Sequence, residues 1–414
     1  MTDVIETPAG ATSGAQESRG CPFVHEEFIA PRPQGEVWAL GDRLREQGGV
    51  HWNTQAQGWW MFSSDEAVRD IFRHPDIFSS QSITPWDPFP QYTTVPTMID
   101  GKEHIRYRRL LNPWFTAEHV KTAEDDIRAI AKRRVAEIKA QGHCNFPVDF
   151  ALEYTTELYL KFTGMPTEDT PMLRGWVDDF FAGYGGNPET QAAMANAVAG
   201  LTAYLQDAVA ERRAWSAPRE GDFASKLMFD SNETERPFSD QELVDLLLLA
   251  IIGGLDTTSS QLSFLFRHLG ANAGDRRRLV AEPEIIPLAV EEGLRYYPIL
   301  FGDGRKVMRD HEFHGVALKQ GDMVWAVTGG ANRDPNAYER ANEFIVDRQK
   351  NQHTTFALGS HRCVGMHLAR ASMRIATEEW LAAIPEFRLA ADGVLLERGA
   401  GSMLSPLDVP LVWD

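Results

Sequence analysis

Apolar residues recur every three or four positions along most of the chain, as they do in helices that bury one face. This spacing predicts helices over residues 37–44, 67–72, 120–138, 201–209 and 243–266. Alternation typical of strands is less common. The segments VHWNT and GWWMF predict a hairpin around Gln55 to Gly58, and residues 306–327 predict short strands with turns at His314-Gly315 and Gln320-Gly321. The pattern therefore predicts a mainly helical fold with a small β region.

Two stretches carry no helical period. Residues 76–100 contain four prolines, and a loop of this length in a compact protein is typically a binding element. Residues 182–190, AGYGGNPET, connect two helical segments. Either stretch could form a lid over a buried site. Because no repeat or linker divides the rest of the chain, we expect a flexible leader over residues 1–30 and one domain over residues 31–414.

The composition is that of an ordinary globular protein, with 43% hydrophobic and 24% charged residues. The first residues lack the basic and apolar segments of a secretion signal, and the apolar run from Leu246 to Leu255 is far shorter than a membrane span. Three widely separated cysteines argue against a disulfide framework and suit a reducing compartment. The net charge of −18 argues against nucleic acid or an anionic membrane as partners. We therefore expect a cytoplasmic protein.

One cysteine has the surroundings of a metal ligand. Cys363 lies in a short loop, FALGSHRCVG, directly before the helix-forming stretch MHLARASMRIATEEW. A helix that begins just after the cysteine directs unpaired N–H groups and its positive dipole end toward the sulfur, which favours the thiolate that binds iron. Gly359 and Gly365 would let the backbone approach a flat cofactor closely. The alternative for such a residue is a buried structural cysteine.

This loop begins at Phe356 and has the spacing FxxGxxxCxG. It resembles the haem-ligand loop of the cytochrome P450 superfamily, in its soluble bacterial class. The resemblance implies a haem b cofactor whose iron is bound by Cys363. It also implies the fold of that family, with the haem buried between an oxygen-binding helix and the cysteine-loop helix. Phe356, Gly359 and Gly365 would complete the cofactor loop. The family often has glycine where this chain has Ala357, a difference expected to alter loop packing more than iron ligation.

The longest apolar helix contains two adjacent glycines, followed by Asp256 and Thr257. Each glycine costs about 0.5–1 kcal/mol relative to alanine in a helix interior, so Gly253 and Gly254 indicate either close helix packing or a flat group against this face. The Thr257 hydroxyl can bond the Gly253 carbonyl four residues back. By resemblance to the family's oxygen-activating helix, Gly253, Asp256 and Thr257 are the catalytic residues. Thr257 would hold water beside the dioxygen, and Asp256 would connect it to bulk protons.

Two further groups of charged residues match family positions. Glu292 and Arg295 can meet on one helical face, a pair that is weak and common in isolation but resembles the family's ExxR, with Arg348 as its third member and a structural role. Haem carries two carboxylates, which arginine is suited to bind. By the resemblance, the residues that bind these carboxylates are His104, Arg108, Arg305 and His361.

The motifs GGLDT, DGR, EFHG, HTTFxxGSHxCxGxHLAR and PLVW resemble the camphor-hydroxylating group of the family. In that group a loop tyrosine donates a hydrogen bond to the substrate oxygen, which the resemblance assigns to Tyr92; the alternative is an aromatic anchor of the loop. An apolar pocket is expected from Ile83, Trp86, Phe89, Leu249, Ile252, Phe301 and Met403. Because Phe301 and Ile83 differ from the residues of the camphor group at these positions, 1,8-cineole and a norisoprenoid ketone are candidate substrates in addition to camphor.

The resemblance implies a haem-thiolate monooxygenase that inserts one oxygen atom from O2 into a small terpenoid. Electrons would come from a [2Fe-2S] ferredoxin and its NADH-dependent ferredoxin reductase, with the ferredoxin docking near Arg106, Arg109 and Arg362. One alternative is a peroxide-driven peroxygenase, which needs no Asp256–Thr257 relay. Another is a non-catalytic haem gas sensor, which would normally need an output module.

Overall fold

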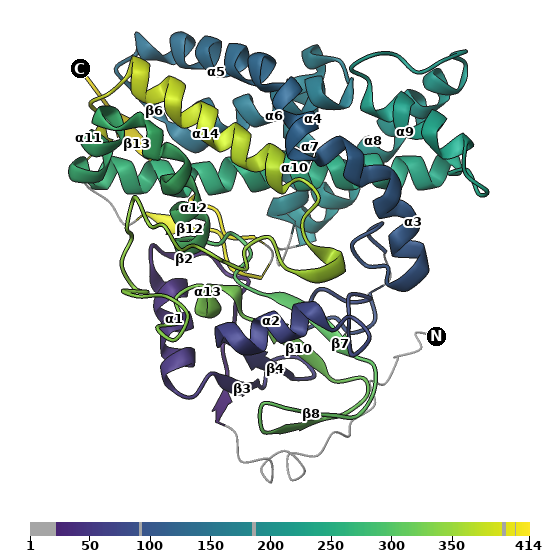
Figure 1. Cartoon of the computed structure of the whole chain (residues 1–414), viewed down its shortest axis with the longest axis vertical. Helices are drawn as coiled ribbons and strands as arrows, with labels where there is room; N and C mark the ends of the chain where they lie inside the picture. The colour runs from purple at the N-terminus through teal and green to yellow at the C-terminus, as the bar shows by residue number, and fades with distance from the viewer. Residues whose placement is uncertain (1–21, 91–92, 184–187, 391–394, 402) are drawn as a thin grey trace.

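The computed structural model describes residues 22–90, 93–183, 188–390, 395–401 and 403–414. Helices fill one side of the molecule, and most strands gather on the other (Figure 1). The helices are α1 (Glu36–Glu46), α2 (Asp65–Arg73), α3 (Gly101–Leu111), α4 (Ala117–Thr122), α5 (Glu124–Lys139), α6 (Leu152–Thr163), α7 (Thr170–Ala182), α8 (Pro188–Arg213), α9 (Phe223–Asn232), α10 (Asp240–Ala271), α11 (Ala273–Ala281), α12 (Ile286–Tyr296), α13 (Thr328–Ala331) and α14 (Met366–Ala383). The strands are β1 (Phe23–Val24), β2 (Arg32–Pro33), β3 (Val50–Asn53), β4 (Trp59–Phe62), β5 (Phe78–Ser79), β6 (His143–Asn145), β7 (Asp303–Val307), β8 (His311–Phe313), β9 (Val316–Leu318), β10 (Met323–Ala326), β11 (Arg388–Leu389), β12 (Leu396–Glu397) and β13 (Pro410–Val412). The predicted fold class, mainly helical with a small β region, is confirmed.

The main sheet has the strand order β1-β3-β4-β10-β7-β5. The predicted hairpin is present, with Trp52 of β3 opposite Trp60 of β4 in an antiparallel pair. β10 runs parallel to β4 and antiparallel to β7. Both predicted turns occur, and His314, Gly315 and Gly321 all adopt the positive φ that tight turns require.

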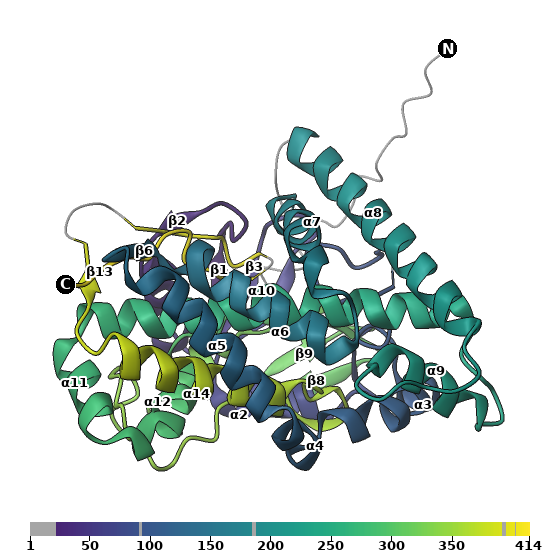
Figure 2. The same cartoon turned by 90° about the horizontal axis from the view of Figure 1, so that it is seen from above.

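Helix α10 passes through the middle of the helical side and contacts α6 and α8 (Figures 1 and 2). Its start is fixed by a capping box, in which the Ser239 hydroxyl accepts from the Glu242 N–H and the Glu242 carboxylate accepts from the Ser239 N–H. By length and composition α10 could cross a membrane, and it is the one helix of the described ranges that meets this test. Half of its most apolar window is buried inside the structure, as in the core helix of a large protein.

The apolar stretch predicted as helical over residues 120–138 is helical except at Ala123, which divides it into two helices. α4 ends at Thr122 and α5 begins at Glu124, with Ala123 between them. Three consecutive acidic residues, Glu124, Asp125 and Asp126, occupy the first turn of α5, where negative charge favours a new helix start. The apolar spacing continues across this break, so the spacing alone does not reveal where one helix ends and the next begins.

Helices α7 and α8 pack closely and rise above the other helices in Figure 2. Gly200 of α8 lies against the Trp176 ring of α7, where an added methyl group would be 2.7 Å from the ring. Within the predicted connection over residues 182–190, residues 184–187 lie outside the described chain. The predicted loop over residues 76–100 forms no helix in its described part and leads directly into α3. Of the predicted leader, only residues 22–30 are described, and the single domain stays a prediction.

Candidate active site

A cavity of about 240 Å³ lies between α10 and the loop that precedes α14. Its walls also include parts of α3, α6 and α9 and the segment Pro96–Thr97. Residues far apart in the sequence therefore meet around one space. The predicted site residues that line it are His104, Arg108, Leu249, Gly253, Thr257, Phe356, His361, Cys363 and Gly365.

The Cys363 side chain faces this cavity. Its backbone N–H donates to the Phe356 carbonyl at 2.8 Å, which closes the loop, and α14 begins three residues later at Met366. Burial raises the pKa of the Cys363 thiol, while the Gly365 N–H and the Arg108 guanidinium act in the opposite direction. The side chain is open to the cavity, and a cation bound there would offset the cost of keeping the thiolate away from water, so the site suits a metal ion.

Two residues of the cysteine loop have left-handed backbone conformations. Gly359 has φ of 69°, and an added methyl group there would lie 2.7 Å from the Phe72 carbonyl oxygen. Only glycine fits this position. Ala357 has φ of 52°, a conformation that costs an L-residue roughly 1–2 kcal/mol. The family's usual glycine would remove this strain, so the sequence difference affects the backbone of the loop.

The two adjacent glycines of α10 serve different purposes. Gly254 packs against Tyr159 of α6, where an added methyl group would be 2.0 Å from the ring. Gly253 faces the cavity, and the nearest atom to an added methyl group is Cδ1 of Leu249 at 4.0 Å. One glycine therefore permits close helix packing, and the other leaves room for a ligand. The Thr257 hydroxyl donates to the Gly253 carbonyl at 2.5 Å, four residues back.

Asp256 points away from the cavity and does not line it. Its Oδ2 atom accepts from Arg398 at 2.6 Å, and the residue is 5% exposed. The Arg398 guanidinium also lies 5.1 Å from the ring centroid of Phe181 on α7. Near this pair, burial raises the pKa of Asp178, with Arg174 opposing and Asp256 adding to the shift. Sequence reasoning missed Arg398, because it is 142 positions from its partner and belongs to no motif.

Of the four residues predicted to bind the haem carboxylates, His104, Arg108 and His361 line the cavity, and Arg305 interacts with Asp100, the partner of His361. The His104 and His361 rings stack with centroids 4.1 Å apart. Burial, followed by the charges of His361 and Arg108, lowers the pKa of His104 to about 4. Arg305 is 5% exposed, and in the described ranges its guanidinium makes one hydrogen bond, to the Gly304 carbonyl, and no ion pair. A buried guanidinium needs an anion, and a haem carboxylate fits this requirement.

Asp100 is a member of this cluster that sequence reasoning missed. It accepts from the Ser79 hydroxyl and pairs with Nε2 of His361 at 2.9 Å. Burial acts against its ionisation, but the bonds from His361 and Ser79 prevail and lower the pKa of Asp100. Its carboxylate orients His361, whose ring lines the cavity. The sequence signal was its place at the end of the VPTxxD segment, just before α3.

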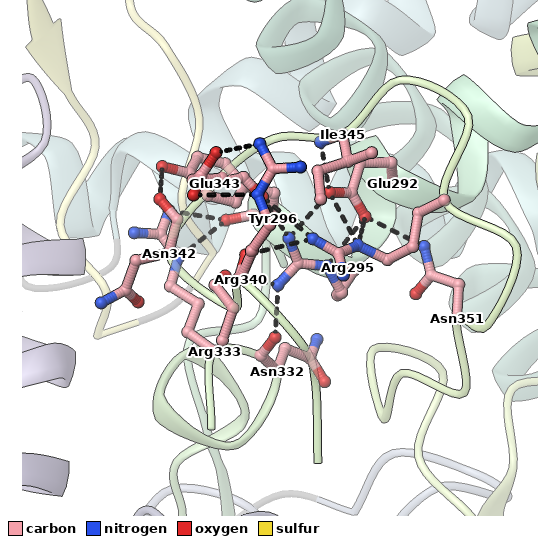
Figure 3. Close-up of polar contacts among 12 residues, drawn as sticks. Glu292, Arg295, Tyr296, Asn332, Arg333, Arg340, Asn342, Glu343, Ile345 and Asn351 are labelled. Carbon is pink, nitrogen blue, oxygen red and sulfur yellow. Dashed lines mark hydrogen bonds and ion pairs between the residues drawn. The ribbon is translucent and has the colours of Figure 1, made fainter. Parts of the chain in front are cut away.

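The Glu292 carboxylate, itself fully buried, is the centre of a polar network whose other members are buried or half-buried (Figure 3). Arg295 donates to both of its oxygens at 2.8 Å, and Nε of Arg348 lies 2.9 Å from Oε2. The Ile345 N–H and the Asn351 amide complete its contacts. Removing one partner of such a buried set typically costs about 3–5 kcal/mol, because an unpaired charge is left inside.

This network continues into the cysteine loop. Arg295 donates to the Asn332 carbonyl, and the Asn332 side chain bonds Thr354 and Thr355, which directly precede Phe356. The Thr355 hydroxyl donates to the Leu294 carbonyl at 2.7 Å. Helix α12 is therefore joined to the loop by consecutive hydrogen bonds, which fits a bracing role for Glu292, Arg295 and Arg348.

Several residues expected to contact a substrate lie elsewhere. Phe301 packs in the core against Trp38 and over Gly329, where an added methyl group would be 2.4 Å from its ring. Phe89 is 71% exposed, with the Lys306 ammonium 4.2 Å from its ring centroid. Tyr92 lies outside the described residues. The other residues predicted for the substrate pocket that do not line the cavity are Ile83, Trp86, Ile252 and Met403, and the predicted cofactor residues that do not line it are Arg305 and Gly359.

Other wall residues were not identified from the sequence. They include Pro96, Thr97, Phe115, Leu158, Tyr159, Phe223, Leu246, Ala250 and Thr258. The α10 members could have been found, because Leu246 and Ala250 share a helical face with Gly253 and Thr257. Those from α6 and α9 could not, since their position depends on how these helices pack beside α10.

A cysteine facing a cavity that also carries guanidinium and imidazole groups for two carboxylates defines a haem-thiolate site. The family model described as Cytochrome P450 matches residues 177–388. The chain is 31% identical over 392 residues to probable cytochrome P450 127A1 of Sinorhizobium fredii, covering 93% of this chain and 92% of the relative. It is 31% identical over 353 residues to the steroid C26-monooxygenase of Mycolicibacterium smegmatis, covering 84% and 86%. The solved structure of CYP101J2 matches with a TM-score of 0.84 at 27% identity, covering 99% of this chain and 100% of that chain.

The chain therefore belongs to the cytochrome P450 family and is a P450 monooxygenase with haem b as its cofactor. The Arg305 guanidinium, which has no ion pair within the described ranges, the open face at Gly253 and the Cys363 side chain in the cavity are all consistent with this cofactor.

Proposed function

We propose that this monooxygenase hydroxylates a small terpenoid, of the size of camphor or 1,8-cineole. The observation that carries the proposal is the α10 wall of the cavity, which is apolar at Leu246, Leu249 and Ala250 and offers hydroxyls only at Thr257 and Thr258. Such a wall orients a compact hydrocarbon by shape. Thr97, on the opposite segment, adds one polar group that a ketone or ether oxygen could contact.

Haem b, when bound through Cys363, supplies oxygen activation and electron transfer. Residues of α10 control the delivery of protons to the cavity. The Thr257 hydroxyl is held at the Gly253 carbonyl inside the cavity, and Asp256 lies one residue away on the side of Arg398. We infer that Asp256 carries protons from the Arg398 side and that Thr257 holds the proton donor at the cavity face. Because Asp256 does not line the cavity, it must rotate about its side-chain bonds to deliver a proton.

A larger substrate is the second candidate, and a specific observation favours it. The relative from Mycolicibacterium smegmatis is named a steroid C26-monooxygenase. A norisoprenoid ketone lies between the two classes in size. The Asp256–Thr257 pair argues against a peroxide-driven peroxygenase, because that reaction needs no proton relay. The same pair argues against a non-catalytic gas sensor.

The expected electron donor is a [2Fe-2S] ferredoxin that receives electrons from an NADH-dependent reductase. Of the three arginines expected at its docking surface, Arg109 of α3 and Arg362 of the cysteine loop are exposed. Arg106 instead pairs with Glu242, and its guanidinium lies 4.6 Å from the Tyr107 ring centroid. We therefore place the docking site at Arg109 and Arg362 and leave Arg106 out. We also infer a cytoplasmic location from the acidic composition and the reducing environment that the cysteines suit.

The test is a spectral titration of the haem-loaded protein with camphor, 1,8-cineole, a norisoprenoid ketone and a steroid. A terpenoid that displaces water from the iron and is hydroxylated with NADH, reductase and ferredoxin supports the proposal. Binding and turnover of the steroid alone would overturn the substrate class. Full turnover with peroxide in the absence of ferredoxin would overturn the proposed reaction.

A further inference from the structure

A second cavity, of about 650 Å³, opens between α4, α5, α6 and α9. Its inner wall is apolar and includes Trp114, Ile130, Leu158 and Phe162. The second cavity adjoins the active site at this wall, because Leu158 lines both cavities.

The two cavities are separated by one layer of side chains. Leu158 lines both. Phe115 and Phe223 line the haem cavity, whereas Trp114 and Phe162 line the second cavity. The ring centroids of Phe115 and Phe162 are 5.4 Å apart, and those of Trp114 and Phe223 are 5.5 Å apart. Rings at these distances are in direct contact, so no further residue fits between the cavities.

Backbone geometry places these residues on opposite sides of the layer. Trp114 and Phe115 are neighbours in the short turn η3 (Asn112–Phe115), and their rings face different cavities. Leu158 and Phe162 are one turn apart on α6. The Phe115 and Phe162 rings are tilted by 44° and are not stacked flat, so rotation of either ring changes the width of the gap. Such rotations are part of ordinary side-chain motion inside proteins.

We propose that the layer formed by Phe115, Leu158, Phe162 and Phe223 is a passage for small apolar diatomic gases. O2 during turnover, and CO in vitro, would reach the haem cavity through it, separately from the organic substrate. The inference rests on haem binding and is independent of the substrate class.

The chemistry of the layer selects this class of ligand. A water molecule in a buried site needs two to four polar partners, which the four side chains of the layer do not offer. A terpenoid is wider than the gap that the rotation of one ring opens. The outer mouth carries the Lys161–Asp126 ion pair at 2.9 Å and the Lys226 ammonium 5.0 Å from the Trp114 ring centroid. Hydrated charges at the mouth disfavour entry of a bulky apolar molecule but do not hinder a dissolved gas.

Flash photolysis of the ferrous CO complex tests the passage, because the rate at which CO returns from solution reports access to the haem and not activity. Phe162→Ala widens the layer and is expected to raise the CO association rate constant about threefold or more. Leu158→Trp or Phe162→Trp fills it and is expected to lower the rate constant by a similar factor. The effects should persist with a terpenoid bound, when the substrate route is closed.

Phe344→Ala is the matched control, since Phe344 stacks on His268 and lies in neither cavity wall. An unchanged Soret band of the CO complex shows that each variant keeps an intact thiolate-bound haem. If the widening and filling variants both match wild type, or if Phe344→Ala changes the rate as much as Phe162→Ala, the passage does not exist. If Phe162→Ala fails to fold, Phe162→Leu widens the layer in its place, and Leu158→Trp and Phe162→Trp replace each other as filling variants, so both directions are tested in any case.

Discussion

Asp256 and Arg398 form an ion pair of 2.6 Å that joins α10 to the C-terminal segment, although 142 positions separate them in the chain. Arg398 follows β12, which pairs with β2 near the N-terminus. Its guanidinium also meets Phe181 on α7. The position of the proposed proton-carrying acid is therefore set by segments from both ends of the chain and by α7.

Arg398→Gln should uncouple oxygen consumption from product formation. The substitution removes the cation that holds Asp256, so the carboxylate loses its fixed place in the relay, and a stability loss of about 2 kcal/mol should accompany the broken pair. We expect more peroxide and less product per NADH, with a changed solvent isotope effect. The measurement is product and peroxide per NADH consumed.

Arg388→Gln is the control for this experiment, because Arg388 is exposed and has no contact with Asp256. If Arg398→Gln lowers stability but leaves coupling and the isotope effect at wild-type values, Arg398 has a structural role only.

Thr257→Ala should leave haem and substrate binding intact and divert reduced oxygen to peroxide. The hydroxyl that donates to the Gly253 carbonyl at 2.5 Å is lost, and with it the group that holds a proton donor at the cavity face. Thr257→Ser keeps this hydroxyl and should retain most of the coupling. Equal coupling in the alanine variant and wild type would refute the proposed relay.

The adjacent glycines of α10 offer a matched pair of substitutions. Gly254→Ala places a methyl group 2.0 Å from the Tyr159 ring and should destabilise the protein by about 2 kcal/mol. Gly253→Ala meets no atom closer than 4.0 Å and gains up to about 1 kcal/mol of helix propensity, but its methyl group enters the cavity. We expect the first variant to lower Tm and the second to weaken CO or substrate binding at unchanged Tm. A lower Tm for Gly253→Ala and weaker ligand binding for Gly254→Ala would show that the packing role and the cavity role are assigned to the wrong glycines.

The sequence predicted the parts of the site that lie within short motifs. The loop around Cys363, the pairing of Glu292 with Arg295, and the bond from Thr257 to Gly253 each depend on residues at most a few positions apart, so helix or turn geometry determines them. The direction of Phe301 and the partner of Asp256 depend instead on packing between distant segments. Phe301 was expected in the apolar substrate pocket by resemblance to the camphor group, but its ring lies in the core above Gly329. A single sequence carries no signal for such contacts.

Ala357→Gly should stabilise the cysteine loop. Ala357 has φ of 52°, and glycine adopts this conformation without strain, so the folded state should gain about 1 kcal/mol after the entropy cost of glycine is subtracted. The midpoint of chemical unfolding of the haem-loaded protein should rise, with the Soret band unchanged. Ala369→Gly in α14 is the control and should lower the midpoint, because glycine weakens a helix. A fall in both variants would show that the loop does not store strain at Ala357.

The contact between the start of α10 and α3 should make stability depend on pH in the acid range. Burial disfavours the charged form of Glu242, but the Ser239 N–H, the Tyr107 hydroxyl and Arg106 outweigh it and lower its pKa from 4.5 to about 2. A depressed carboxylate pKa stabilises the fold above pH 4.5, and this contribution is lost as the pH falls from 4.5 toward 2. For this partly exposed side chain it amounts to at most about 3 kcal/mol. Glu242→Gln should therefore be less stable than wild type at neutral pH, and the difference should shrink as the pH falls through this window. Unfolding by urea at a series of pH values measures it, and a difference that does not vary with pH would mean that Glu242 contributes through its shape and not its charge.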